Sequence, residues 1–324
     1  MGNKKDKFNL NKSKIILTLV GIILCFLLVS YLANGDLLSR QYKSLIVPVG
    51  INIILAVSLN LTTGFLGELS LGHAGFMAVG AYSGALFTLN VDLPGPIEFI
   101  IAIFIGGGVA AIFGYLIGVP VLRLRGDYLA IVTLAFGEII RSLINSSEFT
   151  GGAIGLSKIP RYANYTWVFI IVVITVILIN NLVNSRYGRV IDSIRENYIA
   201  AETIGIKVSK YKTMAFVIAA FFAGVAGVLY AHNFSVLKPS NFDYNKSIEV
   251  LVIVVLGGMG SIKGSIIAAI VLTVLPEMLR AANEYRTLLY AIVLIAMMLI
   301  QSSDLRNRLE KSGKLPKLLK KVEK

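Results

Sequence analysis

Two glycine-rich stretches interrupt apolar segments of the chain and hold polar groups that a solute could contact. The first covers residues 64–75, GFLGELSLGHAG, and the second covers residues 257–264, GGMGSIKG. Where a helix breaks at membrane depth, its freed N–H and C=O groups can meet a polar solute, and ionisable side chains there are costly and often functional. We therefore predict a translocation pathway that includes Gly67, Glu68, Ser70, Gly72, His73, Gly257, Gly258 and Gly260.

The same residues also allow a purely structural interpretation. Both breaks would then be short cytoplasmic loops between two membrane spans. Glu68 would be an acid at the membrane interface, and His73 would be a packed, hydrogen-bonded histidine rather than a ligand. Further along, Glu138 and Arg141 can pair on one helix face because they are three residues apart. The alternative is that Glu138 and Arg141 contact a zwitterionic solute.

A charged segment between two apolar runs, residues 185–212, predicts a contact outside the membrane. Residues 195–204 have helical character with small side chains at Ala200 and Ala201, and Gly205 then ends the helix. A short helix flanked by basic residues suits docking to a cytoplasmic partner. The alternative is an ordinary solvated loop that lies at the lipid headgroups.

Side chains for catalysis or metal binding are scarce. The chain has one cysteine, Cys25, two histidines, His73 and His232, and no G-x-x-x-x-G-K-[S/T] phosphate-binding motif. We therefore expect no enzymatic activity, no catalytic or metal-binding residue and no cofactor bound by this chain. If ATP drives transport, partner subunits must hydrolyse it.

The elements that position these residues are predicted to be membrane helices. The chain of 324 residues is 56% hydrophobic and 15% charged, with a mean hydropathy of +0.77, whereas soluble domains have about 25% charged and about 45–50% apolar residues. The composition predicts an all-α polytopic bundle of 8–10 transmembrane helices with discontinuous or re-entrant segments. The candidate spans are 15–33, 44–63, 76–90, 97–119, 127–145, 166–184, 213–236, 247–256, 264–281 and 287–301, of which the third, eighth and last are short.

Basic residues predict the orientation of these spans. With ten spans, 22 of the 31 Lys and Arg residues fall on one side and 8 on the other, and the richer side is cytoplasmic by the positive-inside rule. This places a basic N-terminus (1–14) and a basic tail (302–324) in the cytoplasm, on either side of a transmembrane domain (15–301). An eight-span arrangement with two re-entrant segments fits nearly as well. This distribution also explains the net charge of +13 better than nucleic-acid binding does.

Small residues recur every four positions in two of the predicted spans. One series is Gly106, Ala110, Gly114 and Gly118, and the other is Ala219, Ala223, Gly227 and Ala231. This spacing lets helix backbones approach closely in lipid. We expect bundle packing, and the alternative is that the small residues line a pore.

Four segments, in order along the chain, resemble the branched-chain amino-acid ABC transporter permease family, and the M-type (LivM-like) subunit is the nearer match. The resemblance extends over about residues 45–300, and related permeases for urea, nucleosides or sugars share much of the pattern. The matching segments are NLTTGFLGELSLGHAGFMAVGAY at 60–82, LRGDYLAIVTL at 124–134 with FGEIIR at 136–141, the stretch from 195 to 205 running into Tyr211, and GGMGS at 257–261.

The resemblance implies one permease subunit of a heteromeric importer in the plasma membrane of a prokaryote. Its partners would be a paralogous permease subunit, two cytoplasmic ATPase subunits and an extracytoplasmic binding protein that delivers branched-chain amino acids. Such permeases carry a coupling loop written E-A-A-x-x-x-G; Ala200, Ala201 and Gly205 match its spacing, and Ile199 stands where the Glu would be. The resemblance implies ATPase coupling through Arg195, Glu196, Ala200, Ala201 and Gly205.

Two rival classes have less support in the sequence. A proton- or sodium-coupled secondary transporter would need buried acids as coupling sites, and the predicted spans hold very few. A polytopic membrane enzyme would need His, Asp or Glu residues clustered near one membrane face, and no such cluster is evident. Urea, nucleoside or sugar substrates remain open within the ABC class.

Overall fold

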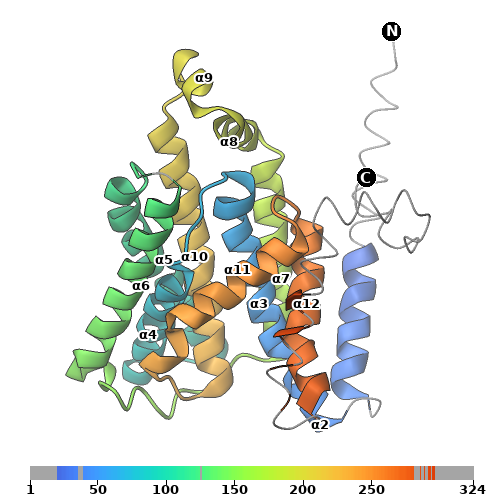
Figure 1. Cartoon of the computed structure of the whole chain (residues 1–324). Coiled ribbons are helices and arrows are strands. Elements are labelled where there is room, and N and C mark those ends of the chain that lie inside the picture. Colours follow the sequence, from blue (N-terminus) through green and yellow to red (C-terminus); the bar gives the residue numbers. More distant parts are fainter. Residues whose placement is uncertain are drawn as a thin grey trace.

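The chain folds into an all-α bundle whose long helices run side by side in roughly one direction (Figure 1). The computed structural model describes residues 20–35, 39–124 and 126–280, together with residues 285, 288, 291, 292, 294 and 295. The expected basic termini and most of the predicted span 287–301 lie outside these residues. Within them no strand forms, and the only extended pairing is an isolated bridge between Leu156 and Leu237.

Five helical stretches in the described part are long and apolar enough to cross a membrane: Arg40–Phe65, Gly95–Val121, Asp127–Ser146, Tyr165–Val183 and Val208–Phe234. The first comprises α2 (Arg40–Ser44), α3 (Ile46–Asn60) and a π-helix, η1 (Leu61–Phe65), and the others are α5, α6, α7 and α10. A shorter apolar helix, Val20–Asn34, precedes them. These stretches coincide with predicted spans and confirm the polytopic all-α class.

The remaining elements are shorter helices. They are α4 (His73–Asn90), η2 (Glu148–Thr150), α8 (Arg186–Glu196), α9 (Tyr198–Thr203), η3 (Pro239–Phe242), α11 (Tyr244–Gly257) and α12 (Ile262–Met278). With 14 residues, α11 falls short of the roughly 20 residues that a span requires. The sequence prediction of a short eighth segment that continues into a break is therefore confirmed.

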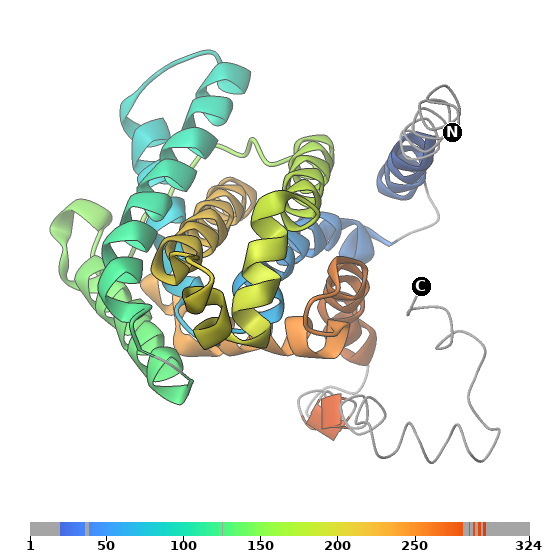
Figure 2. The same ribbon diagram turned by 90° about the horizontal axis from the view of Figure 1, so that it is seen from above.

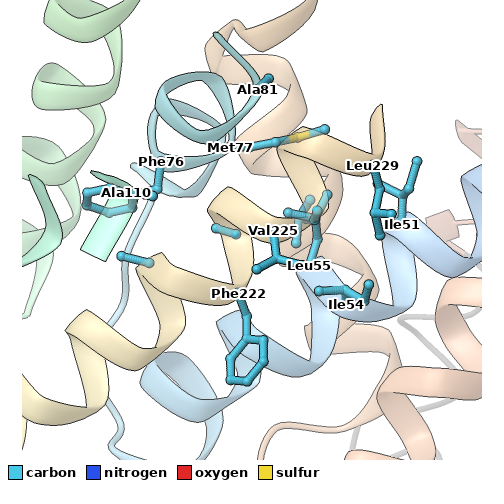
Figure 3. Packing of buried hydrophobic residues seen from close by; sticks show 14 of the residues in the cluster. Ile51, Ile54, Leu55, Phe76, Met77, Ala81, Ala110, Phe222, Val225 and Leu229 are labelled. Carbon is cyan, nitrogen blue, oxygen red and sulfur yellow. The ribbon is translucent and has the colours of Figure 1, made fainter. Parts of the chain in front are cut away.

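Helix α10 forms the centre of the bundle and packs against α3, α4 and α5. Figure 3 shows Ile51, Ile54 and Leu55 of α3 facing Val225 and Leu229 of α10. On the other side of α10, glycines bring three backbones together: a Cβ at Gly80 would collide with Gly224, and one at Gly106 would lie 2.8 Å from the carbonyl oxygen of Gly80. In the second small-residue series, a Cβ at Gly227 would collide with the Met77 carbonyl oxygen, so both series serve helix packing, as expected.

Helix α4 begins well inside the bundle rather than at its surface. The His73 Nε2 atom lies 3.0 Å from the Ser58 hydroxyl, and Ser58 precedes the end of η1 by seven residues, or roughly 10 Å at the rise of a helix. The backbone N–H of Leu71 donates to the Thr133 hydroxyl at 3.0 Å. Thr133 is itself six residues into α6, roughly 9 Å from its start. Both contacts place the start of α4 at membrane depth.

Helix α11 begins beside the start of α4. The Ala74 N–H donates to the Ser247 hydroxyl at 3.0 Å, and Asp243 caps α11 by accepting from the Lys246 N–H at 3.1 Å. From there α11 runs obliquely next to α3 and α12 (Figure 1). Two discontinuous helices therefore start at the same depth and run in different directions.

Candidate functional site

The two glycine-rich breaks meet at one end of the bundle, where Asn60 joins them. This fully buried side chain (0% exposed) accepts a hydrogen bond from the Gly260 N–H at 2.9 Å. Its amide nitrogen donates to the Ser265 hydroxyl on α12 at 3.0 Å. One amide at the end of α3 thus satisfies polar groups of the second break and of the helix that follows it.

Close backbone approach explains the glycine at position 64. A Cβ there would collide with the Asn60 side chain and with the backbone nitrogen of Gly260. Only glycine lets η1 and the 258–261 turn approach this closely. A similar constraint applies within the second break, where a Cβ at Gly257 would lie 2.6 Å from the backbone of Gly264.

Arg195, at the last turn of α8, reaches from the predicted coupling segment to both breaks. Its Nη1 donates to the Gly64 carbonyl at 2.7 Å, which leaves that carbonyl of the π-helix satisfied. A Cβ at Gly67 would lie 3.0 Å from the Arg195 Cγ, and one at Gly260 would lie 3.2 Å from its Nη1. Figures 1 and 2 show α8 and α9 lying across this end of the bundle. The structure therefore brings Arg195, a predicted coupling residue, together with Gly67 and Gly260, two glycines of the predicted pathway.

Glu68 forms an ion pair with Lys212 at the start of α10. Both side chains are largely withdrawn from solvent, with exposed fractions of 14% for Glu68 and 7% for Lys212. Burial of a charge is tolerated when an opposite charge compensates it. Glu68 belongs to the predicted pathway, whereas its partner Lys212 was not predicted; the only sequence feature that marks Lys212 is its position next to an apolar run.

The other predicted pathway residues of the first break are packed inside the chain. Ser70 and His73 are both buried. The contact between His73 and Ser58 agrees with the structural interpretation of His73 as a packed, hydrogen-bonded histidine. A Cβ at Gly72 would lie 2.5 Å from the Thr133 carbonyl oxygen. Thr63 in η1 has a buried hydroxyl with no hydrogen-bond partner among the described residues.

Helices α8 and α9 are built by local capping. Ser185 caps α8, and Asn197 caps α9 by accepting from the Ile199 and Ala200 N–H groups at 3.1 Å each. Gly205 then has φ +87°, as expected for a glycine that ends a helix. Partial burial raises the pKa of the Asp192 carboxyl on α8, while the charge of Arg195 lowers this pKa and that of Glu196 raises it.

The surface of α9 differs from the sequence expectation in one respect. Ala201 is only 2% exposed and packs inward against Leu61, Ile191 and Val208, so its side chain does not face a partner. Ala200, Glu196 and Gly205 are exposed, as are Ile199 and Ile204, of which Ile204 is 76% exposed. The exposed side chains of α9 are therefore Ile199, Ala200, Glu202 and Thr203, and the exposed Ile204 follows directly. Spacing alone did not reveal this because it does not fix which helix face turns inward.

Glu138 and Arg141 pair with each other on α6, with Arg141 Nη2 at 2.6 Å from Glu138 Oε2. This geometry matches the interpretation that the two residues pair with each other.

A cluster of Glu98, Tyr162 and His232 at the end of the bundle opposite α8 was not predicted from the sequence. The Tyr162 hydroxyl donates to Glu98 at 3.2 Å and its ring stacks on His232. Burial, together with this hydrogen bond to Glu98, raises the pKa of Tyr162.

Comparison with known proteins identifies the family of this arrangement. The model of the family described as branched-chain amino acid transport system / permease component matches residues 41–300. The chain belongs to this permease family. It is 38% identical over 313 residues to the high-affinity branched-chain amino acid transport system permease protein LivM of Escherichia coli K12, covering 86% of this chain and 73% of that protein.

Other relatives of the permease are more distant. The E. coli K12 permease protein LivH is 30% identical over 128 residues, covering 39% of this chain and 41% of that protein. The nucleoside ABC transporter permease protein NupC of Lactococcus lactis is 27% identical over 199 residues, covering 52% and 62%. No solved structure matches the permease. Membership of this family and the apolar helices together make the chain a multi-pass membrane permease.

Proposed function

We propose that this permease is a membrane-spanning subunit of an ATP-binding-cassette importer that translocates branched-chain amino acids. The observation that carries the proposal is the 38% identity to LivM over 86% of the chain. The similarity to LivM covers 86% of this chain, whereas the similarity to NupC covers 52% of it. Leucine, isoleucine and valine are therefore the substrates to test first.

The importer requires partners besides this chain. The local similarity to LivH supports a paralogous permease subunit as the second half of the pathway. Two cytoplasmic ATPases supply the energy, because the sequence has no phosphate-binding loop of its own. An extracytoplasmic binding protein delivers the amino acid. With the basic residues distributed as described, we place α8, α9 and both termini in the cytoplasm.

Coupling is proposed to run through the contacts of Arg195. Docking of an ATPase on the exposed face of α9 moves α8, with which α9 is in contact. Arg195 then shifts relative to the Gly64 carbonyl, and Asn60 carries the displacement to the second break through its hydrogen bond with Gly260. The predicted pathway glycines serve as the parts that yield, because glycine turns deform with little steric cost.

The test uses the complete transporter, co-purified from membranes with a tag on this chain and reconstituted in proteoliposomes. With binding protein outside and ATP inside, we expect ATP-dependent accumulation of radiolabelled leucine that unlabelled isoleucine and valine compete away. A preparation assembled without this chain is the control and should not transport. Accumulation of a nucleoside in place of leucine would contradict the proposed substrate and favour the class of NupC.

A further inference from the structure

Helix α11 carries a charged cluster that the coupling contacts leave unexplained. The Lys246 ammonium donates to Glu249 Oε2 at 3.1 Å and to Asn52 Oδ1 at 3.2 Å. The Asn52 amide nitrogen in turn donates to the Thr273 hydroxyl at 2.9 Å. Helices α3, α11 and α12 thus each contribute a polar group to one site.

This cluster lies near the middle of the membrane. Asn52 is twelve residues beyond Arg40, where the first long apolar stretch begins, so it lies about 18 Å along that stretch. Ser247, the neighbour of Lys246, contacts Ala74, which is sixteen residues or about 24 Å from the far end of α4. Asn52 is also thirteen residues, or about 20 Å, from Phe65 at the other end of its stretch, so it lies near the middle of a hydrocarbon core about 30 Å thick.

The charged pair is also partly open on the surface of this chain. The side chains of Lys246 and Glu249 have exposed fractions of 19% and 41%. Charged groups at this depth avoid lipid and face a protein partner or a water-filled cavity. The face of α11 that carries Glu249 is therefore not expected to face lipid.

We propose that Lys246, Glu249 and Asn52 form a mid-membrane subsite for the zwitterionic head of an amino acid in transit, a proposal that rests on the proposed function. The carboxylate of the solute pairs with the Lys246 ammonium, and the α-ammonium of the solute pairs with the Glu249 carboxylate. The empty site is closed by the Lys246–Glu249 pair, which opens to exchange one ion pair for two. Since the site and the solute are each neutral overall, no net charge is buried.

The neighbouring surface of α11 suits an aliphatic side chain. Ile248 and Val252 lie four residues apart on one helix face beside Glu249, and both have accessible surface. With the head group held between Lys246 and Glu249, a branched side chain would reach Val252, which lies three residues beyond Glu249 on the same helix face, on the way to the 258–261 break. Binding here is expected to be weak, because a translocation site must also release its solute.

The experiment compares Lys246→Met and Glu249→Gln with a matched control in the reconstituted transporter. The control is Arg280→Met, which breaks the Glu277–Arg280 pair of the same spacing at the end of α12. We expect leucine uptake to fall about tenfold or more in the two site variants, as for loss of a charge-assisted hydrogen bond. ATP hydrolysis stimulated by leucine-loaded binding protein should stay within about twofold of the wild type, and the control should transport normally.

A second measurement reads ligand contact directly. In a Cys25→Ser background, Glu249→Cys should react with a water-soluble charged methanethiosulfonate reagent, and millimolar L-leucine should slow the reaction. Reaction unaffected by leucine would overturn the subsite, and so would normal uptake by both site variants. Loss of the partner permease from purified Lys246→Met would place the pair in a subunit interface and also overturn it. A wild-type complex that imports no leucine would instead contradict the proposed function. The assignment of an amino acid as the ligand of the subsite would then fail as well.

Discussion

The Arg195 guanidinium on α8 donates a 2.7 Å hydrogen bond to the Gly64 carbonyl in the π-helix that follows α3. Arg195 lies 131 residues further along the chain, in a segment outside the membrane spans, while Gly64 belongs to the first glycine break. A charge-assisted bond of this kind is stronger than a neutral one. This hydrogen bond links α8 to the break without an intermediate side chain, and it is the contact through which the proposed coupling runs.

A methyl group at Gly64 should disturb this junction. Its Cβ would collide with Asn60 and with the Gly260 nitrogen, and overpacking of this kind typically costs about 1–3 kcal/mol. We expect Gly64→Ala to lower the thermal stability of the purified complex and its leucine uptake. Gly108→Ala is the control, since a Cβ there meets nothing within 4 Å; equal behaviour of the two variants would refute the close approach.

The Glu68–Lys212 pair should be costly to break on one side only. Lys212→Met leaves the Glu68 carboxylate buried without its cation, and removal of one partner of a buried pair costs about 3–5 kcal/mol. We expect a lowered unfolding temperature for Lys212→Met and for Glu68→Lys. The double variant Glu68→Gln with Lys212→Met should recover most of the loss, because both charges are removed together. A double variant as unstable as Lys212→Met would show that the ion pair is not the cause.

Small-to-large changes in the two small-residue series, which lie on α5 and α10, should impair folding. A Cβ at Gly114 would lie 2.6 Å from the Ala220 Cβ, and one at Gly227 would collide with the Met77 carbonyl. Gly114→Ile and Gly227→Ile should therefore reduce the amount of monodisperse protein in detergent. Normal yield and uptake with either variant would show that the small-residue series it belongs to faces lipid rather than a neighbouring helix.

Two adjacent alanines of α9 should give different defects. Ala200 is exposed, so Ala200→Glu should leave the permease stable while weakening co-purification of the ATPases. Ala201 is buried against the chain's own core, so Ala201→Glu should lower the stability of the permease itself. If both variants keep their ATPases and transport normally, α9 is not a docking surface.

Gly205→Val tests the exit from α9. A β-branched residue is strained at φ +87°, although the space around Gly205 is open. We expect the permease to insert in the membrane and to lose ATPase association and uptake. Gly205→Asn should retain more of both, because Asn tolerates positive φ better than Val; equal defects would argue against a backbone cause.

The sequence allowed prediction of the class, most spans and both breaks, because apolar length and glycine clusters are local signals. It also predicted pairing of Glu138 with Arg141 through their spacing on one helix. Contacts between distant segments were not predictable: Lys212 with Glu68, Asn60 with Gly260, and Arg195 with Gly64 depend on how helices cross. Asn52 and Asn60 were the available hints, as the only amide side chains in the apolar run 45–66.

The number of leucine molecules imported per ATP hydrolysed, measured in proteoliposomes with Arg195→Ala, tests the coupling account most directly. Without the guanidinium, α8 no longer holds the Gly64 carbonyl, while the exposed face of α9 is unchanged. We predict that the ATPases still co-purify and hydrolyse ATP, and that leucine imported per ATP falls about tenfold or more. Arg189→Ala, an exposed position on the same helix, should keep the wild-type ratio. An unchanged ratio in Arg195→Ala would show that coupling does not run through the contact between Arg195 and Gly64.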